Sequence, residues 1–261
     1  MQGDKNMKKT LITLASITLF TSALNADIAR VEMGGGAWNQ TPKGILSYTD
    51  GATAGTYTSD EKEDQSIYAW LLIKHPLPVL PNLRLEYTTL KDTGIVSGSF
   101  SGFTVPGATT TSSLDITQYD VIPYYNLLDN TFWTTVDVGL DLKVMETTYK
   151  VDGVNVNGIG GISAYEDTTS VIIPMGYVRA RVEIPVTDIG LEADVKYITY
   201  QGNTVSDIRV KADYTLGFIP VVQPAIEIGY RMQKFDLTSD DEKTKMNIDF
   251  SGVYAGLMLR F

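Results

Sequence analysis

Apolar and polar residues alternate with a period of two along most of this chain. The alternation is clearest over residues 131–145, where Val136 and Val138 share one parity and Asp137 and Lys143 share the other. A period of two places successive side chains on opposite faces of a β-strand, whereas an amphipathic helix needs apolar residues three and four apart. The chain is therefore predicted to consist of β-strands, each with one apolar and one polar face.

Ten segments show this pattern. They are residues 27–38, 66–75, 83–91, 114–126, 131–145, 171–184, 191–197, 208–216, 224–235 and 246–261. An even number of antiparallel strands is typical of single-chain transmembrane barrels. We predict an all-β fold, a transmembrane antiparallel up-and-down β-barrel of about ten strands. Eight or twelve strands remain alternatives, because residues 95–105 can be read as another hairpin.

The predicted connections differ in length between the two ends of the barrel. Short turns are expected at residues 76–82, 127–130, 185–190 and 217–222, and long or variable connections at residues 39–65, 92–113, 147–170, 201–204 and 236–245. Bacterial barrels have short turns on the periplasmic side and longer loops outside. The connections at 39–65, 92–113 and 147–170 are therefore predicted to be loops presented to the exterior.

The last strand ends on an aromatic residue, as closing strands of such barrels do. Its apolar face consists of alternate residues up to the C-terminus: Val253, Ala255, Leu257, Leu259 and Phe261. These side chains are predicted to face lipid, and the pattern resembles the signal that the barrel-assembly machinery recognises. Met246, Ile248 and Phe250 have the opposite parity, which predicts a β-bulge near Ser251-Gly252 that re-phases the strand.

The first 26 residues have the features of a secretory signal peptide. The basic pair Lys8-Lys9 precedes the apolar residues 11–24, and Ala26 offers a small residue for cleavage. We predict a removed signal peptide at 1–26 and one barrel domain at 27–261. Export to the outer membrane would then involve periplasmic chaperones as well as the assembly machinery.

The composition disfavours several kinds of partner. Removal of residues 1–26, which carry three lysines and one aspartate, changes the net charge from −10 to −12. An acidic surface argues against nucleic acid as a ligand. The chain has no cysteine, so an exported fold depends on strand pairing instead of disulfides.

Most charged residues on the predicted strands have the parity that faces the lumen. The basic ones are Arg30, Arg84, Lys143, Arg179, Arg181, Lys196, Arg209, Lys211 and Arg231, and the acidic ones are Glu32, Glu86, Asp120, Asp137, Asp141, Glu183, Glu192, Asp194, Asp207, Asp213 and Glu227. Barrels near eight strands are filled by side chains, whereas open channels need about sixteen strands. Because the two signs nearly balance, we favour a lumen filled by ion pairs over a charge-lined pore.

These charges also predict how two neighbouring strands pair. If Lys196 lies opposite Asp207, then Asp194 lies opposite Arg209, whereas a slip by two residues sets Lys196 against Arg209. Opposite charges across a strand pair are favoured and like charges are disfavoured. We predict the first register, with a tight turn at Gln201-Gly202.

The chain offers few residues for catalysis. Its one histidine, His75, falls at a predicted periplasmic turn, away from any nucleophile or carboxylate at the outer mouth. The lack of cysteine and of a second histidine excludes a cysteine nucleophile and His/Cys metal sites. The acidic runs at 59–64 and 239–245 lack the spacing of a calcium-binding loop. We predict a non-enzymatic protein without a catalytic residue, metal or cofactor.

Several short motifs, taken in order, resemble a known family. They are residues 31–38 with Gly34-Gly35-Gly36, residues 75–85, residues 124–130, Gly229-Tyr230-Arg231 and the terminal Phe261. The set is similar to a family of Gram-negative outer-membrane β-barrels named for a Gly-Gly motif near the mature N-terminus. The resemblance spans most of the mature chain except the outer loops. It implies the fold and the location, and it brings no activity, substrate or site.

Two functions are compatible with these features. One is a structural or surface-interaction protein, a narrow barrel that presents its outer loops. The other is a small passive porin for ions or small solutes. Both predict a monomer in contact with outer-membrane lipid and lipopolysaccharide, and the width of the lumen separates them. The glycines at 34–36 lack the Lys-Ser/Thr of a phosphate-binding loop, and we expect them to let a bulky neighbour pack closely.

Overall fold

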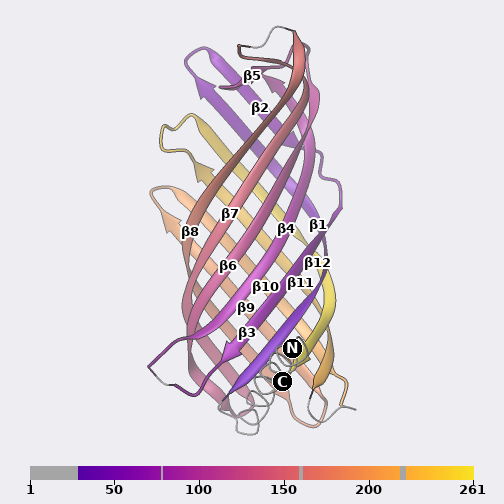
Figure 1. Cartoon of the computed structure of the whole chain (residues 1–261), viewed down its shortest axis with the longest axis vertical. Helices are drawn as coiled ribbons and strands as arrows, with labels where there is room; N and C mark the ends of the chain where they lie inside the picture. Colours follow the sequence, from indigo (N-terminus) through magenta and orange to yellow (C-terminus); the bar gives the residue numbers. More distant parts are fainter. Residues whose placement is uncertain (1–28, 78, 159–160, 218–221) are drawn as a thin grey trace, which may run out of the picture.

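The described residues form a closed antiparallel β-barrel (Figure 1). The computed structural model describes residues 29–77, 79–158, 161–217 and 222–261. The predicted signal peptide at 1–26 lies outside them. No helix in these ranges is long and apolar enough to cross a membrane.

Ten strands close the wall of the barrel, as predicted. Their order around the wall is β1-β3-β4-β6-β7-β8-β9-β10-β11-β12, and β12 pairs back onto β1. The bounds are β1 Arg30–Asp50, β2 Thr53–Ser59, β3 Asp64–Lys74, β4 Asn82–Gly98, β5 Phe103–Thr104, β6 Thr110–Thr131, β7 Thr134–Val156, β8 Ile162–Ile184, β9 Ile189–Tyr200, β10 Asn203–Thr215, β11 Gln223–Thr238 and β12 Thr244–Arg260.

Two further strands lie near the upper end. β2 continues the wall above β3, because it pairs with the same two neighbours, β1 and β4. Residues 60–63 separate β2 from β3. The short β5 pairs with the end of β7, where Phe103 lies opposite Val156. The wall therefore has ten positions around its circumference, and β2 and β3 share one of them.

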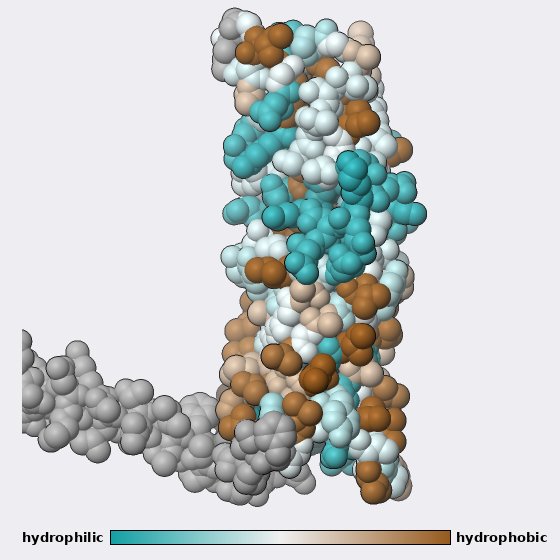
Figure 2. Space-filling view, turned by 90° about the vertical axis from the view of Figure 1, so that its right-hand side faces the viewer, coloured by the Kyte–Doolittle hydropathy of each residue, from teal (hydrophilic) through white to brown (hydrophobic). Residues whose placement is uncertain are grey.

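On the face seen in Figure 2, apolar side chains gather in the lower half and a hydrophilic band crosses the surface above them. The exposed apolar side chains of the lower half form what we call the apolar belt; they include Tyr119, Val121, Leu140, Leu142, Val178, Val195, Val210, Ile228, Val253 and Leu257. Such a belt is the feature by which a transmembrane barrel contacts the hydrocarbon of a bilayer. We call the part of the barrel above the belt the extension.

The interior is charged at the level of the apolar belt and apolar inside the extension. A long strand therefore places its apolar residues outward in the belt and inward above it. On β6, Tyr119 and Val121 face outward while Asp120 is buried inside. Nearer the upper end of the same strand, Ile116 is buried inside and Asp115 faces outward. The parity of the strand does not change; only the surroundings of its outer face change, from the belt to the hydrophilic band.

This inversion explains why the three predicted outer loops were wrong in large part. β1 runs to Asp50 and β2 begins at Thr53, within the predicted loop 39–65. Strands also enter the predicted loop 92–113 from both sides, and the β7–β8 hairpin occupies most of 147–170. Their outer faces are polar, so they lack the outward apolar alternation on which the prediction depended, although their many threonines favour strands.

The predicted register between β9 and β10 is confirmed. Lys196 lies opposite Asp207, Asp194 opposite Arg209, and the strands join through Gln201-Gly202. Both turn residues have positive φ values, 48° and 84°. A two-residue turn with positive φ at both positions has the twist that a hairpin requires.

The predicted bulge near Ser251-Gly252 is wrong. β12 pairs with β1 and β11 without a register shift through these residues. Ile248 and Phe250 are fully buried inside the extension, on the same face as Tyr254 and Met258. Apolar residues of that parity line the interior of the extension, so no re-phasing is needed.

Both ends of the described chain meet at the lower end of the barrel (Figure 1). The Phe261 amide donates to the Val31 carbonyl at 2.9 Å. At this end β6 and β7 are joined by Phe132 and Trp133 alone, so the turn predicted at 127–130 lies further along the chain. The terminal residue thus completes the seam between β12 and β1.

Candidate functional site

The predicted lumen charges are brought together inside the barrel. Eighteen of the twenty are buried. The exceptions are Arg30 and Glu183, whose side chains are 40% and 37% exposed. These two lie at the lower mouth, where Arg30 forms an ion pair with Glu32. The parity of the strands therefore predicted the inward set, and only its two outermost members reach solvent.

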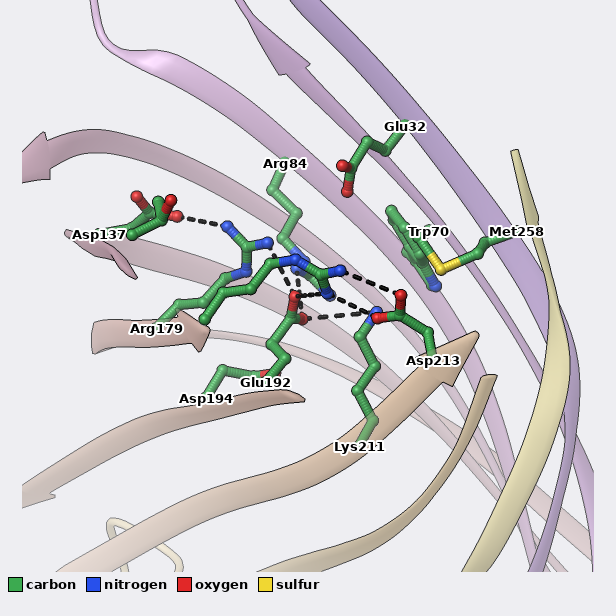
Figure 3. A network of polar contacts seen from close by, with 12 residues as sticks. Glu32, Trp70, Arg84, Asp137, Arg179, Glu192, Asp194, Lys211, Asp213 and Met258 are labelled. Atoms are coloured by element: carbon green, nitrogen blue, oxygen red, sulfur yellow. Dashed lines mark hydrogen bonds and ion pairs between the residues drawn. The ribbon is translucent and has the colours of Figure 1, made fainter. Parts of the chain in front are cut away.

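The lower part of the network is centred on Glu192 (Figure 3). Its carboxylate accepts from Arg179 at 2.7 Å and lies 3.5 Å from both Arg84 and Lys211. Arg179 also donates to Asp137 at 2.6 Å. Hydrogen bonds between charged groups are shorter and stronger than those between neutral groups, so this part of the lumen is tightly cross-linked.

The upper part of the network is centred on Glu86 and Asp207. Glu86 accepts from Lys196 at 2.6 Å and from Arg209 at 2.9 Å. Asp207 accepts two hydrogen bonds from Arg231, at 2.9 and 2.7 Å. The planar guanidinium matches both oxygens of a carboxylate, which fixes the geometry of such a pair.

Several of these contacts cross the full width of the lumen. The wall has ten positions, and β10 lies five positions from β4, so Arg209 and Glu86 join opposite sides. Gln233 on β11 donates to Gln118 on β6, which is also five positions away, at 3.0 Å. Side chains that meet across the centre leave no straight aqueous path between them.

Aromatic side chains occupy the space between the charges. The Trp70 ring lies 4.5 Å from Lys211 Nζ and 5.2 Å from Arg84 Cζ, and its Nε1 donates to Glu227 at 3.2 Å. A Cβ atom at Gly34 would lie 2.7 Å from this ring. The expectation that the glycine run lets a bulky residue pack closely is thus confirmed for Gly34.

The lumen also contains residues that were not predicted from the sequence. Arg260 pairs with Asp213, Tyr68 donates to Glu227 at 2.8 Å, and the Trp38 ring lies 5.1 Å from Arg231 Cζ. Arg260 shares the parity of Tyr254 and Met258, so strand parity alone would have placed it inside. The aromatic contributions could not be found in this way, because aromatic residues also belong to the belt.

Apolar side chains fill the lumen above the charges. Residues from many strands form this core: Leu90, Leu114, Ile116, Met145, Val205, Phe235, Ile248 and Phe250. A second cluster closes the upper end around β5, with Val96, Phe103, Val105, Val151 and Val154. An apolar plug is a poor path for ions or polar solutes.

His75, the one histidine, lies in the lower turn between β3 and β4. Its Nε2 lies 3.0 Å from the Pro81 carbonyl, and its Nδ1 accepts from the Leu77 amide at 3.1 Å. Both ring nitrogens are therefore occupied by the turn. The prediction that this residue sits in a turn is confirmed, and the turn lies at the end of the barrel where the termini meet.

The outer face of the extension carries a groove of about 590 Å³. Residues of both charge signs line it, among them Asp60, Lys62, Lys150 and Glu166. Lys62 and Thr93 donate to Asp60 at 2.7 and 2.8 Å. Burial raises the pKa of Asp60, but these hydrogen bonds outweigh it and hold the pKa below its usual value. Lys150 lies 3.3 Å from Glu166, so both lysines of this groove are paired with carboxylates.

No protein-family model matches the chain, and no curated protein matches it. Among solved structures, the outer-membrane protease OmpT from Escherichia coli is 10% identical, covers 89% of this chain and 97% of its own, and superposes with a TM-score of 0.59. The transport unit of the autotransporter AIDA-I from Escherichia coli has a TM-score of 0.34 at 11% identity, with 90% of each chain covered. A Pseudomonas aeruginosa FadL homologue has a TM-score of 0.25 at 8% identity, again with 90% of each covered.

These comparisons define the class of fold. The likeness to OmpT at 10% identity shows a shared barrel fold alone. The other two superpose too poorly to add to it. Together with the apolar belt, this likeness identifies the fold as that of an outer-membrane β-barrel.

Proposed function

We propose that the protein is an integral outer-membrane barrel with a sealed lumen, whose extension contacts partners outside the cell. The observation that carries the proposal is the set of polar contacts across the lumen, such as Arg209 with Glu86. The apolar core above them provides a second seal. A sealed barrel serves as an anchor, and its projecting part is then the surface available for interaction.

The proposed location includes export and assembly. Residues 1–26 would direct export, and Val253, Ala255, Leu257, Leu259 and Phe261 would form the signal read by the assembly machinery. In support, Val253 and Leu257 face outward and are 51% and 68% exposed. Outer-membrane lipid and lipopolysaccharide would surround a monomer at the belt. The resemblance to the Gly-Gly family remains a prediction.

The porin alternative has less support. A passive channel needs a continuous wet path, and ten-strand barrels have narrow interiors. The buried charges here, such as Lys196 and Asp207, are engaged with partners instead of lining open space. We therefore rank conduction below a structural or surface-interaction role.

We also propose that the protein is not an enzyme. The upper mouth contains no histidine, since His75 is the one histidine of the chain and lies in a lower turn. General-base activation of a nucleophile or water at the outer surface would then depend on a carboxylate, lysine or tyrosine instead of histidine. In the groove described above, Asp60 and Glu166 are engaged with Lys62 and Lys150.

Cysteine labelling in intact cells tests the proposed orientation. The chain has no native cysteine, so Asp240→Cys at an upper turn and Val186→Cys at a lower turn each provide one thiol. Both native residues are exposed. We expect a membrane-impermeant maleimide to label Asp240→Cys on whole cells and Val186→Cys only after the outer membrane is opened. The reverse pattern would contradict the proposed orientation, and equal labelling of both variants in intact cells would contradict insertion.

A further inference from the structure

The upper part of β8 has a free edge. β8 pairs with β7 from Ile162 to Val182, but it pairs with β9 only from Gly176 downward. Within the described ranges, no strand pairs with the other edge of β8 between Ile162 and Met175. The β9–β10 hairpin ends lower than β8 (Figure 1).

A proline lies where the ladder with β9 stops. Pro174 remains in the β7–β8 ladder, opposite Leu142, while the β8–β9 ladder ends two residues below it. Proline has no N–H to donate and is found on edge strands, so it fits the point where a strand becomes an edge. Other wall strands continue upward with neighbours on both sides, as β12 does between β1 and β11.

The free edge belongs to the extension for most of its length. Ile172, 66% exposed, lies opposite Val144 at the upper border of the belt, and residues 166–170 above it are polar. Glu166, Thr168 and Ser170 are exposed on this segment. An unpaired strand leaves a row of N–H and C=O groups that can pair with another chain, and natural proteins normally cover or interrupt it.

The side chains along this edge define what would pair with it. The β7 strand already shows a complementary sequence: Lys150 lies opposite Glu166, Thr147 opposite Thr169, and Met145 opposite Val171. Val171 is 40% exposed, and the Glu166 side chain, which lies 3.3 Å from Lys150, is 60% exposed. The edge therefore offers an acidic position above and an apolar position below.

We propose that an extended peptide segment of a partner protein adds to this edge as a further β-strand. The segment would carry a basic residue beside Glu166 and an apolar residue beside Val171. Main-chain hydrogen bonds supply the affinity in this mode of recognition, and alternate side chains supply the specificity. The inference rests on the proposed function only in placing the extension outside the cell.

The test uses disulfide capture by the refolded full barrel in detergent. The protein carries Thr169→Cys on the free edge or, as the matched control, Asn247→Cys on β12; both native residues are exposed, and Asn247 is paired on both sides. The probe is a synthetic peptide with the sequence of residues 145–151, with cysteine in place of the residue that corresponds to Thr147. We expect capture at least tenfold faster by the Thr169→Cys barrel.

Two N-methylated peptides make the test specific for a strand ladder. Methylation of every second amide removes either the N–H groups that face the edge or those that face away. One methylated peptide should therefore be captured at the original rate and the other at least tenfold more slowly. Equal rates for the two methylated peptides, or for the two barrels, would overturn the proposal.

A second copy of the chain is the competing occupant of this edge. Without peptide, the Thr169→Cys barrel would then form a disulfide-linked dimer faster than the Asn247→Cys barrel, and that result would also overturn the proposal. Migration of the folded barrel before and after heating shows that each variant is folded. Because the assay needs neither a membrane nor conductance, its failure leaves the proposed location and seal standing.

Discussion

Replacement of Glu86 by glutamine is expected to lower the free energy of unfolding of the barrel by about 3–5 kcal/mol. The Glu86 carboxylate is in contact with three cations, Arg84, Lys196 and Arg209, and all four side chains are buried. Glutamine keeps the size of the side chain but removes the charge that compensates them. A buried charge that loses its partner is strongly destabilising, whereas the intact network is not itself a large source of stability.

Urea unfolding of the refolded protein in lipid vesicles measures this effect. Trp38 and Trp70 are buried in the lumen, so their fluorescence reports the loss of packing. The matched control is Glu146→Gln on β7, where the glutamate is exposed on the extension; we expect a change within about 0.5 kcal/mol. Equal effects of the two substitutions would mean that Glu86 does not hold the network together.

Deletion of Phe261 is expected to leave export intact and to prevent most of the protein from inserting as a folded barrel. Phe261 contributes in two ways to assembly. It ends the alternating apolar face of β12, and its backbone pairs with Val31 across the seam, with the Phe261 amide donating at 2.9 Å. Loss of both should weaken recognition by the assembly machinery and closure of the wall.

Heat-modifiable migration of the outer-membrane fraction measures this outcome. The matched control is Phe132→Ala, because Phe132 is an exposed aromatic residue at the same end of the barrel but lies outside the seam. The control should insert at the level of the unmodified protein. Normal insertion of the Phe261 deletion would contradict the role assigned to the C-terminal strand.

The ten wall strands and the inward charges could be predicted because, next to lipid, apolar residues that face outward alternate with polar residues that face the lumen. The β9–β10 register could be predicted because its charges are complementary in one alignment only, with Lys196 opposite Asp207. In each case the sequence contains a pattern that one arrangement satisfies and its alternatives do not. The buried network then followed from the narrow width of a ten-strand barrel.

The extension could not be predicted by the same rule. Phe250 and Ile248 were read as lipid-facing, because apolar residues in a membrane strand normally point outward; above the belt they point inward to the core. Likewise, the strands around Thr148 and Thr168 have polar outer faces, which in sequence resemble a loop. Apolar and polar residues still alternate with a period of two where the outer face passes from lipid to water. Next to lipid the apolar residues face outward, whereas next to water they face the interior.

The contacts across the lumen also could not be predicted from the sequence. Parity places Arg209 and Glu86 inside, but not opposite one another, since that depends on the order of strands around the wall. The free edge of β8 similarly depends on where the β8–β9 ladder ends. Both features arise from the closure of the barrel and not from any one segment.

Single-channel recording of the refolded mature protein in a planar bilayer tests the seal most directly. The matched variant carries Arg179→Ala and Arg181→Ala, which remove two cations from the lower lumen. We expect no steady conductance from demonstrably folded, unmodified barrels, because side chains fill the lumen. Steady conductance that shifts in the double variant would contradict this expectation, because the lumen would then be an aqueous path lined by those arginines and the protein a small porin.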